Sequence, residues 1–575
     1  MKKIYTLLTA LCLGSVAMAQ DAFWTPTTYR GAFPVTDNTP ATDWTAGWSN
    51  FDPETTVYPT TITTVSADIT TNTTWSGVVK LMNKVYVKNN ATLTIAPGTI
   101  IRGDKLTQGT LIITRGAKII ADGTVANPIV FTSNEAVGAR NEGDWGGLVI
   151  LGLAKNNQPG GVANIEGIVP TTDSQFGGNF DNDYSGILRY VRVEFAGIAL
   201  EPNKEINGIT FGSVGNQTIV DYVQVTLSGD DSFEWFGGTV NCKKLIAYKT
   251  TDDDFDTDFG YRGMVQFGIA VKDTAYFDLS WNAPSGSSTS ETFESDNDAA
   301  GSGKLPLTSA VFSNITCVGP VPLDKTYNDL ASVQKNAFRR GARIRRNSRL
   351  SVVNSVFMGY RNFIMFDGDS VLIAAGVKSS SFSETSNVIR NNYIANTAAC
   401  AAAGATNTGL AEVDSKNTPA ALDAWLRDTK NGNKVDDANY ATGAILVDPK
   451  NATAPDFRPI AASKINTLAN YDAAILTKYG KFSSVNTVGN LVVTNAYPVP
   501  ATDNVNVELY AVASENVAVS ISDISGKVVK SLGNQSLVAG GNMITASVSE
   551  LNNGLYFLNV VSNGSKTTYR FTVAK

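Results

Sequence analysis

The chain of 575 residues contains no histidine. This absence excludes Ser-His-Asp and Cys-His catalysis, zinc sites with histidine ligands, and any reaction in which an imidazole moves a proton. Catalysis by this chain would therefore need carboxylates, lysine, arginine, tyrosine or a metal ion held by oxygen atoms. Composition alone does not identify a reaction.

Long basic and long apolar runs are also missing from most of the chain. With a net charge of −6 and no Lys/Arg run of length, no nucleic-acid partner is expected. The exception is an apolar run over residues 4–17, which follows Lys2-Lys3 and ends in Ala17-Met18-Ala19. This pattern predicts a signal peptide over residues 1–19. No later run reaches about 18 apolar residues, so the mature chain is expected to have no transmembrane segment.

Cysteine is scarce. Of four residues, Cys12 lies in the predicted signal peptide, which leaves Cys242, Cys317 and Cys400. At most one disulfide can form among these three, and a core of this size needs none. Their spacing matches no metal–thiolate site, so all three are predicted to be small buried hydrophobic residues.

Short apolar runs fill the middle of the chain. From Thr74 to about Ser355, runs of three to five apolar residues are separated by Gly, Asn and Asp, as at 85–87, 93–95 and 111–113. Short strands at regular spacing predict an all-β fold. A β-sandwich would show longer alternating strands joined by hairpin turns.

One sequence pattern repeats along these strands. Asp231-Ser232-Phe233-Glu234 recurs after 22 residues at 253–256, and after 38 more at 291–294. A period near 22 in strand-rich sequence is typical of one coil of a right-handed parallel β-helix, a solenoid of stacked coils. Phe233, Phe255 and Phe293 are then predicted to form one inward-facing aromatic column.

Several segments resemble secreted pectate-lyase-like β-helix proteins. Residues 91–101 (ATLTIAPGTII) and 116–133 are similar to their opening coils, and Asp456-Phe457-Arg458-Pro459 is similar to their closing coils. The resemblance covers roughly residues 75 to 465 and implies the fold, but says little about activity. We therefore predict a parallel β-helix domain over residues 76–480.

Two further segments complete this domain. Residues 20–75, which are rich in Trp, Thr and Pro, are predicted to form an N-terminal cap region over the first coil. Residues 421–430 carry the clearest helix pattern in the chain and are predicted to pack near the far end of the solenoid.

The last part of the chain has a different pattern. After Asn486, longer alternating strands separated by Gly and Asn predict a small Ig-like β-sandwich over residues 490–575. This part resembles the type A sorting domain of type IX secretion substrates. The motifs that carry the resemblance are those at 497–503, 523–529, 553–557 and 569–573, with Val499 where Asn is usual.

This second resemblance implies a route and a location. The type IX secretion machinery would recognise the C-terminal domain and carry the protein across the outer membrane. The protein is then expected to be secreted, and after removal of the tail to be extracellular or attached to the outer-membrane surface.

The repeat also aligns acidic residues. Alternate strand residues point to opposite faces, so Glu234, Asp256 and Glu294 are predicted to form an outward column beside Asp258 and Asp296. Carboxylates on neighbouring coils repel unless a cation lies between them, and oxygen-only ligands favour Ca²⁺. The predicted calcium ligands are Asp231, Glu234, Asp253, Asp254, Asp256, Asp258, Glu291, Glu294 and Asp296.

Basic and aromatic residues near these coils leave the function open. By resemblance to calcium-dependent pectate-type lyases, a Lys or Arg beside the metal would take a proton from a uronate. The candidates for this base are Lys249, Arg262, Arg343 and Arg345. The arginine-rich run at 338–349 could instead pair with carboxylates of adjacent coils. Candidates for stacking on sugars, unless they are core residues, are Trp235, Tyr261 and Trp281.

The sequence therefore favours a secreted or cell-surface β-helix protein that binds a glycan or another surface ligand. The alternative is a calcium-dependent polysaccharide lyase acting on uronate-containing polymers. A glycosidase that uses two carboxylates is a third possibility.

Overall fold

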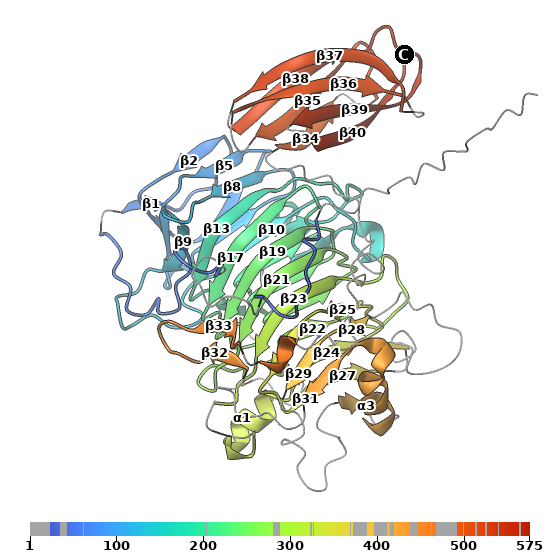
Figure 1. Ribbon diagram of the computed structural model, residues 1–575. Helices are drawn as coiled ribbons and strands as arrows, with labels where there is room; N and C mark the ends of the chain where they lie inside the picture. The colour runs from blue at the N-terminus through green and yellow to red at the C-terminus, as the bar shows by residue number, and fades with distance from the viewer. Residues whose placement is uncertain are drawn as a thin grey trace, which may run out of the picture.

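Parallel strands stacked in coils form most of the molecule (Figure 1). The computed structural model describes residues 23–34, 43–60, 62–201, 204–279, 288–322, 325, 327–368, 370–371, 388–395, 411–413, 419–436, 445–461, 463–466, 491–497, 500–511, 514–523, 526–538, 540–562 and 565–575. The predicted signal peptide (1–19), Trp281 and Cys400 lie outside these residues. Within the described part of the chain, no helix is long and apolar enough to cross a membrane.

Two long parallel sheets form the walls of the solenoid. The seventeen-stranded sheet comprises β1 (Thr63–Val65), β2 (Thr73–Trp75), β3 (Val78–Leu81), β5 (Thr92–Ile95), β6 (Ile100–Gly103), β8 (Lys118–Asp122), β9 (Ile129–Ser133), β13 (Gly186–Glu194), β17 (Ile219–Thr226), β19 (Asn241–Tyr248), β21 (Met264–Val271), β23 (Val311–Val318), β25 (Ser351–Val353), β26 (Val356–Met358), β28 (Ile389–Arg390), β29 (Tyr393–Ala395) and β31 (Lys434–Asp436). The ten-stranded sheet comprises β4 (Lys84–Val87), β7 (Thr110–Ile113), β10 (Gly147–Leu151), β16 (Ile209–Gly212), β18 (Phe233–Phe236), β20 (Phe255–Asp258), β22 (Phe293–Ser295), β24 (Arg340–Arg345), β27 (Asn362–Asp367) and β30 (Ala411–Val413).

The remaining elements of the solenoid are short. Antiparallel pairs are formed by β11 (Ala163–Asn164) with β12 (Gln175–Phe176), β14 (Ala199–Glu201) with β15 (Lys204–Glu205), and β32 (Leu446–Asp448) with β33 (Asp456–Pro459). The α-helices are α1 (Ser332–Ala337) and α3 (Pro419–Arg427), and the 3₁₀ turns are η2 (Pro159–Gly161), η3 (Thr172–Ser174), η5 (Tyr327–Asp329), η7 (Thr429–Asn431) and η9 (Lys464–Asn466). The predicted helix at 421–430 corresponds to α3 and η7. Leu422 and Leu426 of α3 are buried in the solenoid core, as expected for a packing element.

The interior is built from columns of apolar side chains in register. Phe233 pairs with Phe255, and Phe255 with Phe293, in the parallel ladder of β18, β20 and β22. Ring centroids are 5.8 Å apart in the first pair and 5.4 Å apart in the second, and all three rings are fully buried. The predicted aromatic column is therefore confirmed. The period near 22 arises because one coil brings equivalent residues into the same register.

A bend in the long strands produces a corner of each coil. β13 pairs with β8 through its first half and with β9 through its second half, so two walls of the solenoid merge at this strand. The residues at the bend have a positive φ and align from coil to coil; they are Tyr190, Tyr222, Lys244 and Phe267. The predicted alignment of Tyr222 with Lys244 is thus confirmed.

The N-terminal segment lies along the side of the solenoid. The backbone N–H of Thr25 donates to Gln266 of β21 (2.8 Å), and that of Ala32 donates to Thr316 of β23 (2.9 Å). Trp24 packs with residues of β21, β23 and β25. The part of the cap region at 23–34 therefore crosses middle and late coils, because their outer surface offers apolar residues for its aromatic side chains. Only β1 and β2 of this region pair with the first coils.

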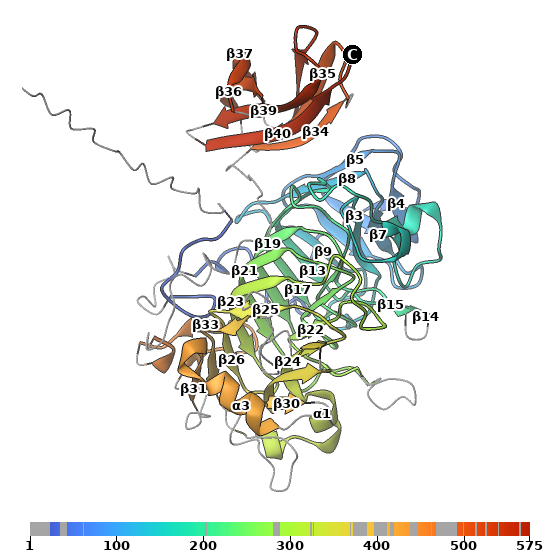
Figure 2. The same ribbon diagram turned by 90° about the vertical axis from the view of Figure 1, so that its right-hand side faces the viewer.

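The C-terminal strands form a separate β-sandwich with its own core (Figure 2). One sheet contains β34 (Leu491–Tyr497), β35 (Asn504–Ala511) and β38 (Gly540–Ser547). The other contains β36 (Glu515–Ser522), β37 (Val528–Leu537), β39 (Gly554–Ser562) and β40 (Ser565–Val573). All pairings within these two sheets are antiparallel. Cys242 and Cys317, by contrast, lie in the solenoid core, where both are buried and free as predicted.

A buried carboxylate ahead of β13 gives a testable pH dependence. Asp183 accepts hydrogen bonds from the Ser185 hydroxyl (2.8 Å) and the Gly215 backbone (3.2 Å), and burial raises its pKa to about 6. In the unfolded chain this carboxyl ionises near pH 4, so its ionisation opposes folding as the pH rises from about 4 to about 6. Relative to Asp183→Asn, the wild type should lose on the order of 2 kcal/mol of unfolding free energy over this window. Urea unfolding at a series of pH values measures it, and a constant difference would contradict the assignment.

Candidate cation-binding site on the ten-stranded sheet

Three consecutive strands of the ten-stranded sheet align acidic side chains. Glu234 of β18 pairs with Asp256 of β20, which pairs with Glu294 of β22. These residues alternate with the inward phenylalanines, so their side chains lie on the outer side of the sheet. The acidic turn that precedes each strand adds further carboxylates beside them. The repeat thus places acids from several coils next to one another.

The carboxylates gather in three groups whose oxygen atoms lie within 4.8 Å of one another. The groups are Asp230/Asp231/Asp252, Asp231/Glu234/Asp256 and Asp253/Glu291/Glu294. Asp231 belongs to two of them. Backbone hydrogen bonds lock the acidic turns together, since Asp231 accepts from the N–H of Asp253 (2.8 Å) and Asp253 accepts from that of Glu291 (2.6 Å).

The acidic groups lie outside the solenoid core but are covered. Glu291 is fully buried, and Glu234 and Glu294 are only 6% and 7% exposed. The insertion that carries β11 and β12 packs on the outer face of this sheet, where Ile165 and Phe176 meet Phe236. The coil stacking and this insertion together remove most of the water around the carboxylates.

Several carboxylate oxygens in the groups have no hydrogen-bond partner within the described residues. They are Oδ1 of Asp252, Oδ1 of Asp256 and Oε2 of Glu291, and each is inaccessible to solvent. Burial and the neighbouring carboxylates raise the pKa of Asp231, Glu234, Asp252, Asp253 and Asp256 well above the usual range. A divalent cation would satisfy these oxygens and offset the repulsion. The donor set consists of oxygen atoms alone, which fits Ca²⁺.

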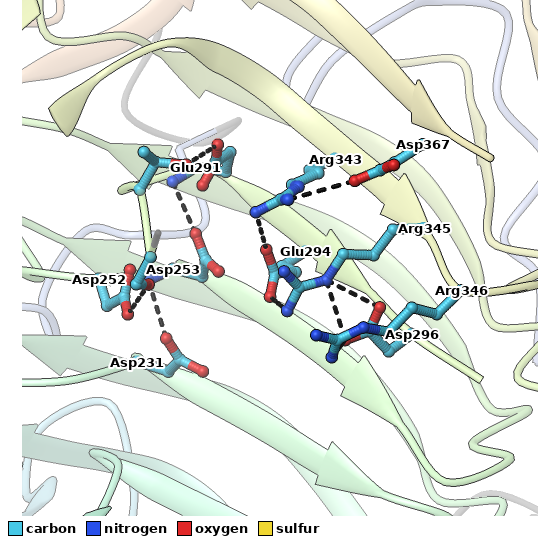
Figure 3. A network of polar contacts seen from close by, with 12 residues as sticks. Asp231, Asp252, Asp253, Glu291, Glu294, Asp296, Arg343, Arg345, Arg346 and Asp367 are labelled. Atoms are coloured by element: carbon cyan, nitrogen blue, oxygen red, sulfur yellow. Dashed lines mark hydrogen bonds and ion pairs between the residues drawn. The ribbon is translucent and has the colours of Figure 1, made fainter. Parts of the chain in front are cut away.

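Arginines form the border of the acidic site on the next coil (Figure 3). Arg345 of β24 contacts Glu294 and holds Asp296 with its Nε at 2.8 Å from Oδ1. Arg346 also reaches Asp296, at 2.9 Å. The arginine-rich run therefore pairs with carboxylates of the adjacent coil, which is the charge-compensating arrangement that the sequence allowed.

Three of the predicted calcium ligands lie apart from the groups. Asp254 turns toward Lys272, whose Nζ is 3.3 Å from its Oδ1, and both side chains are fully buried. Asp296 is occupied by the arginines, and Asp258 accepts a hydrogen bond from the N–H of Phe259 (2.6 Å). The other six predicted ligands take part in the three groups.

The four candidate bases lie at different distances from the acids. Arg343 is 3.5 Å from Glu294, and its other nitrogen is 3.2 Å from Asp367. Arg345 contacts the same glutamate. Lys249 pairs with Asp273 at 3.3 Å, and Arg262 with Asp181 at 2.6 Å. Only the two β24 arginines among these four are paired with a member of the acidic groups in the described structure.

Two of the aromatic candidates are core residues. Trp235 and Tyr261 are fully buried in the solenoid, with stacked rings whose centroids are 5.3 Å apart. The proposal that they stack on a sugar is therefore wrong for both. Trp235 occupies the inward position between Glu234 and Phe236, which the strand alternation already indicates.

Two acidic residues of the groups are not among the predicted ligands. Asp230 and Asp252 join Asp231 in the first group. Both lie in acidic turns and are separated by the same 22 residues that relate Phe233 to Phe255. The repeat period would have found them, had it been extended one residue before each aligned motif.

The coils, the two parallel walls and the outer acidic columns define a parallel β-helix protein. Residues 64–444 match the pectate-lyase-like β-helix domain family, which is more than half of the chain. The protein belongs to this family. Residues 495–574 match the secretion-system C-terminal sorting domain. The protein is therefore a type IX secretion substrate that is secreted and is extracellular or attached to the outer-membrane surface.

Comparisons with individual proteins add little. No curated protein matches the sequence. The enzymatically active domain of tailspike protein 2 from bacteriophage CBA120 is 9% identical, with a TM-score of 0.23, over 87% of this chain and 72% of that chain. The corresponding domain of tailspike protein 4 from the same phage is 9% identical, with a TM-score of 0.24, over 87% and 62%. Likeness at these scores carries no argument about this chain.

Proposed function

We propose that this protein binds a polysaccharide at the cell surface, using the calcium-loaded outer face of its ten-stranded sheet. The observation that carries the proposal is the set of three acidic groups on consecutive coils, with oxygens that have no partner in the described structure. Ca²⁺ held by these groups would neutralise the carboxylates and offer coordination positions to oxygen atoms of a sugar.

The groups most accessible to a polymer border the covered acids. Asp256 and Asp258 of β20 and Arg343 and Arg345 of β24 are half-buried, and the side chain of Arg346 is 43% exposed. They form a band of mixed charge across adjacent coils. Such a band suits a polymer that carries both hydroxyl and carboxylate groups, because guanidinium groups bind carboxylates and calcium binds both.

Binding is tested on immobilised pectate, alginate and glycosaminoglycans, with calcium and with EDTA. The wild type should bind at least one polymer in calcium and lose at least tenfold in affinity in EDTA. Asp256→Asn should lose binding in both buffers. The matched control is Asp122→Asn on β8 of the other sheet, where Asp122 pairs with Arg189, and it should bind like the wild type. Binding that is insensitive to EDTA and to Asp256→Asn would refute the proposal.

A calcium-dependent polysaccharide lyase is the second candidate. Arg343 favours it, because its guanidinium lies 3.5 Å from a carboxylate of the third acidic group. A lyase would release unsaturated uronides, whose ultraviolet absorbance rises with time on one of the same polymers. That rise should disappear in EDTA and in Arg343→Ala. A flat trace on every polymer that binds would leave a binding protein.

A further inference from the structure

A lysine and an aspartate face each other inside the solenoid, away from the acidic groups. Lys272 follows β21 and Asp254 precedes β20, so the chain leaves the pair through one strand and returns to it through the other. The Lys272 Nζ lies 3.3 Å from the Asp254 Oδ1, and both side chains are fully buried. The pair closes the wall of one coil without contact with bulk water.

Neighbouring groups hold both side chains in place. The Thr292 hydroxyl donates to the Asp254 Oδ2 at 3.0 Å, and it shares a second hydrogen bond of 2.5 Å with the Tyr360 hydroxyl. The Lys272 amine donates to the backbone carbonyl of Asp252. These contacts anchor the carboxyl group by one oxygen and leave its other oxygen beside the amine.

The surroundings favour the uncharged forms of the two groups. A buried ion pair loses the hydration of both charges, and transfer of one proton from the ammonium to the carboxylate removes both charges at once. Burial raises the pKa of Asp254 to about 6, which makes that transfer easier. A neutral amine and a carboxylic acid held in contact are the two reactants of amide formation, and fixed proximity replaces the entropy of their encounter.

We propose that Lys272 and Asp254 condense to an intramolecular isopeptide bond. The ammonium first gives a proton to the Asp254 Oδ1, and the Lys272 Nζ then attacks Cγ. The bond from Nζ to Cγ forms, the bond from Cγ to Oδ1 breaks, and Oδ1 leaves as water with the transferred proton and one more from the amine. The Thr292 hydroxyl stabilises the negative charge that develops on Oδ2. The step needs no oxidant or cofactor.

The bond would turn one coil into a covalent ring. This coil contains β20 and β21, at the centre of the solenoid, and β20 carries Asp256 of the acidic site. A cross-link of this kind stabilises mainly by reducing the freedom of the unfolded chain, as a disulfide does. The inference does not depend on the proposed glycan or calcium binding.

Mass spectrometry of the full-length folded protein tests the bond. The wild type should be lighter than its sequence by one water, and a tryptic digest should contain a branched peptide that joins the segments carrying Asp254 and Lys272. Lys272→Arg keeps the positive charge but has no amine that can condense, so it should show the unmodified mass. It should also unfold at a lower temperature than the wild type.

A matched control comes from a similar pair at the surface. Lys249 and Asp273 have the same separation of 3.3 Å, but their side chains are 20% and 32% exposed, so water solvates both. Their peptides should remain linear, and Lys249→Arg should leave the branched peptide unchanged. Wild-type protein with an unmodified mass and ordinary tryptic cleavage after Lys272 would overturn the proposal. This measurement decides even if Lys272→Arg fails to fold.

Discussion

EDTA is expected to lower the melting temperature of this protein by several degrees, and calcium in excess should restore it. Calcium that binds the folded chain alone, at about one hundred times its Kd, adds about 2.7 kcal/mol to the free energy of unfolding. The physical source is the set of buried carboxylate oxygens without a partner in the described structure, which repel one another when no cation is bound. Differential scanning calorimetry in the two buffers measures the shift.

Asp256→Asn should change stability in opposite directions in the two buffers. Asp256 belongs to the second acidic group, and burial and nearby acids such as Glu294 raise its pKa. In EDTA the neutral amide removes one repelling charge, so the variant should be more stable than the wild type. In calcium the variant loses a ligand, so it should be less stable. The change of sign separates a cation site from a merely crowded acidic surface.

The control for this experiment is Asp122→Asn on β8, which should give the same small shift in both buffers. A melting temperature that responds neither to EDTA nor to Asp256→Asn would contradict the calcium site. An unchanged EDTA response in Asp256→Asn would place the cation in the third group, which Asp256 does not join.

Phe255→Ala should cost about 3–5 kcal/mol of unfolding free energy, as for other buried phenylalanines truncated to alanine. The Phe255 ring is fully buried between Phe233 and Phe293, and its centroid lies 5.6 Å from that of Phe312. Truncation leaves a cavity that neighbouring coils cannot fill without breaking their ladder hydrogen bonds. Calcium affinity should also fall, because Asp256 is the next residue of the same strand.

Urea unfolding of Phe255→Ala in calcium measures the loss. Phe180→Ala is the control, because this side chain is 62% exposed and its truncation should change the free energy by less than about 0.5 kcal/mol. A cost below about 1 kcal/mol for Phe255→Ala would mean that the aromatic column does not hold the coils together.

The sequence by itself determined the solenoid, its register and the sorting domain. Phe233, Phe255 and Phe293 recur with the coil, and stacking follows from that recurrence because each coil must bury its apolar side against the next. The same recurrence predicted the pairing of Arg343 with Met365 and of Arg345 with Asp367 between β24 and β27. The sorting domain was recognisable because its motifs are local and ordered along the chain.

Only the tertiary structure decided which charges meet. The period-2 alternation assigns a face to residues inside a strand, but Asp253 and Asp254 precede β20 and escape it. One of them joins the acidic site and the other pairs with Lys272 in the interior. The cover over Glu234 comes from an insertion far away in sequence, packed through Phe176. Local patterns carry no record of such long-range packing, so burial, and with it the chemistry of these carboxylates, emerges only when the coils are stacked.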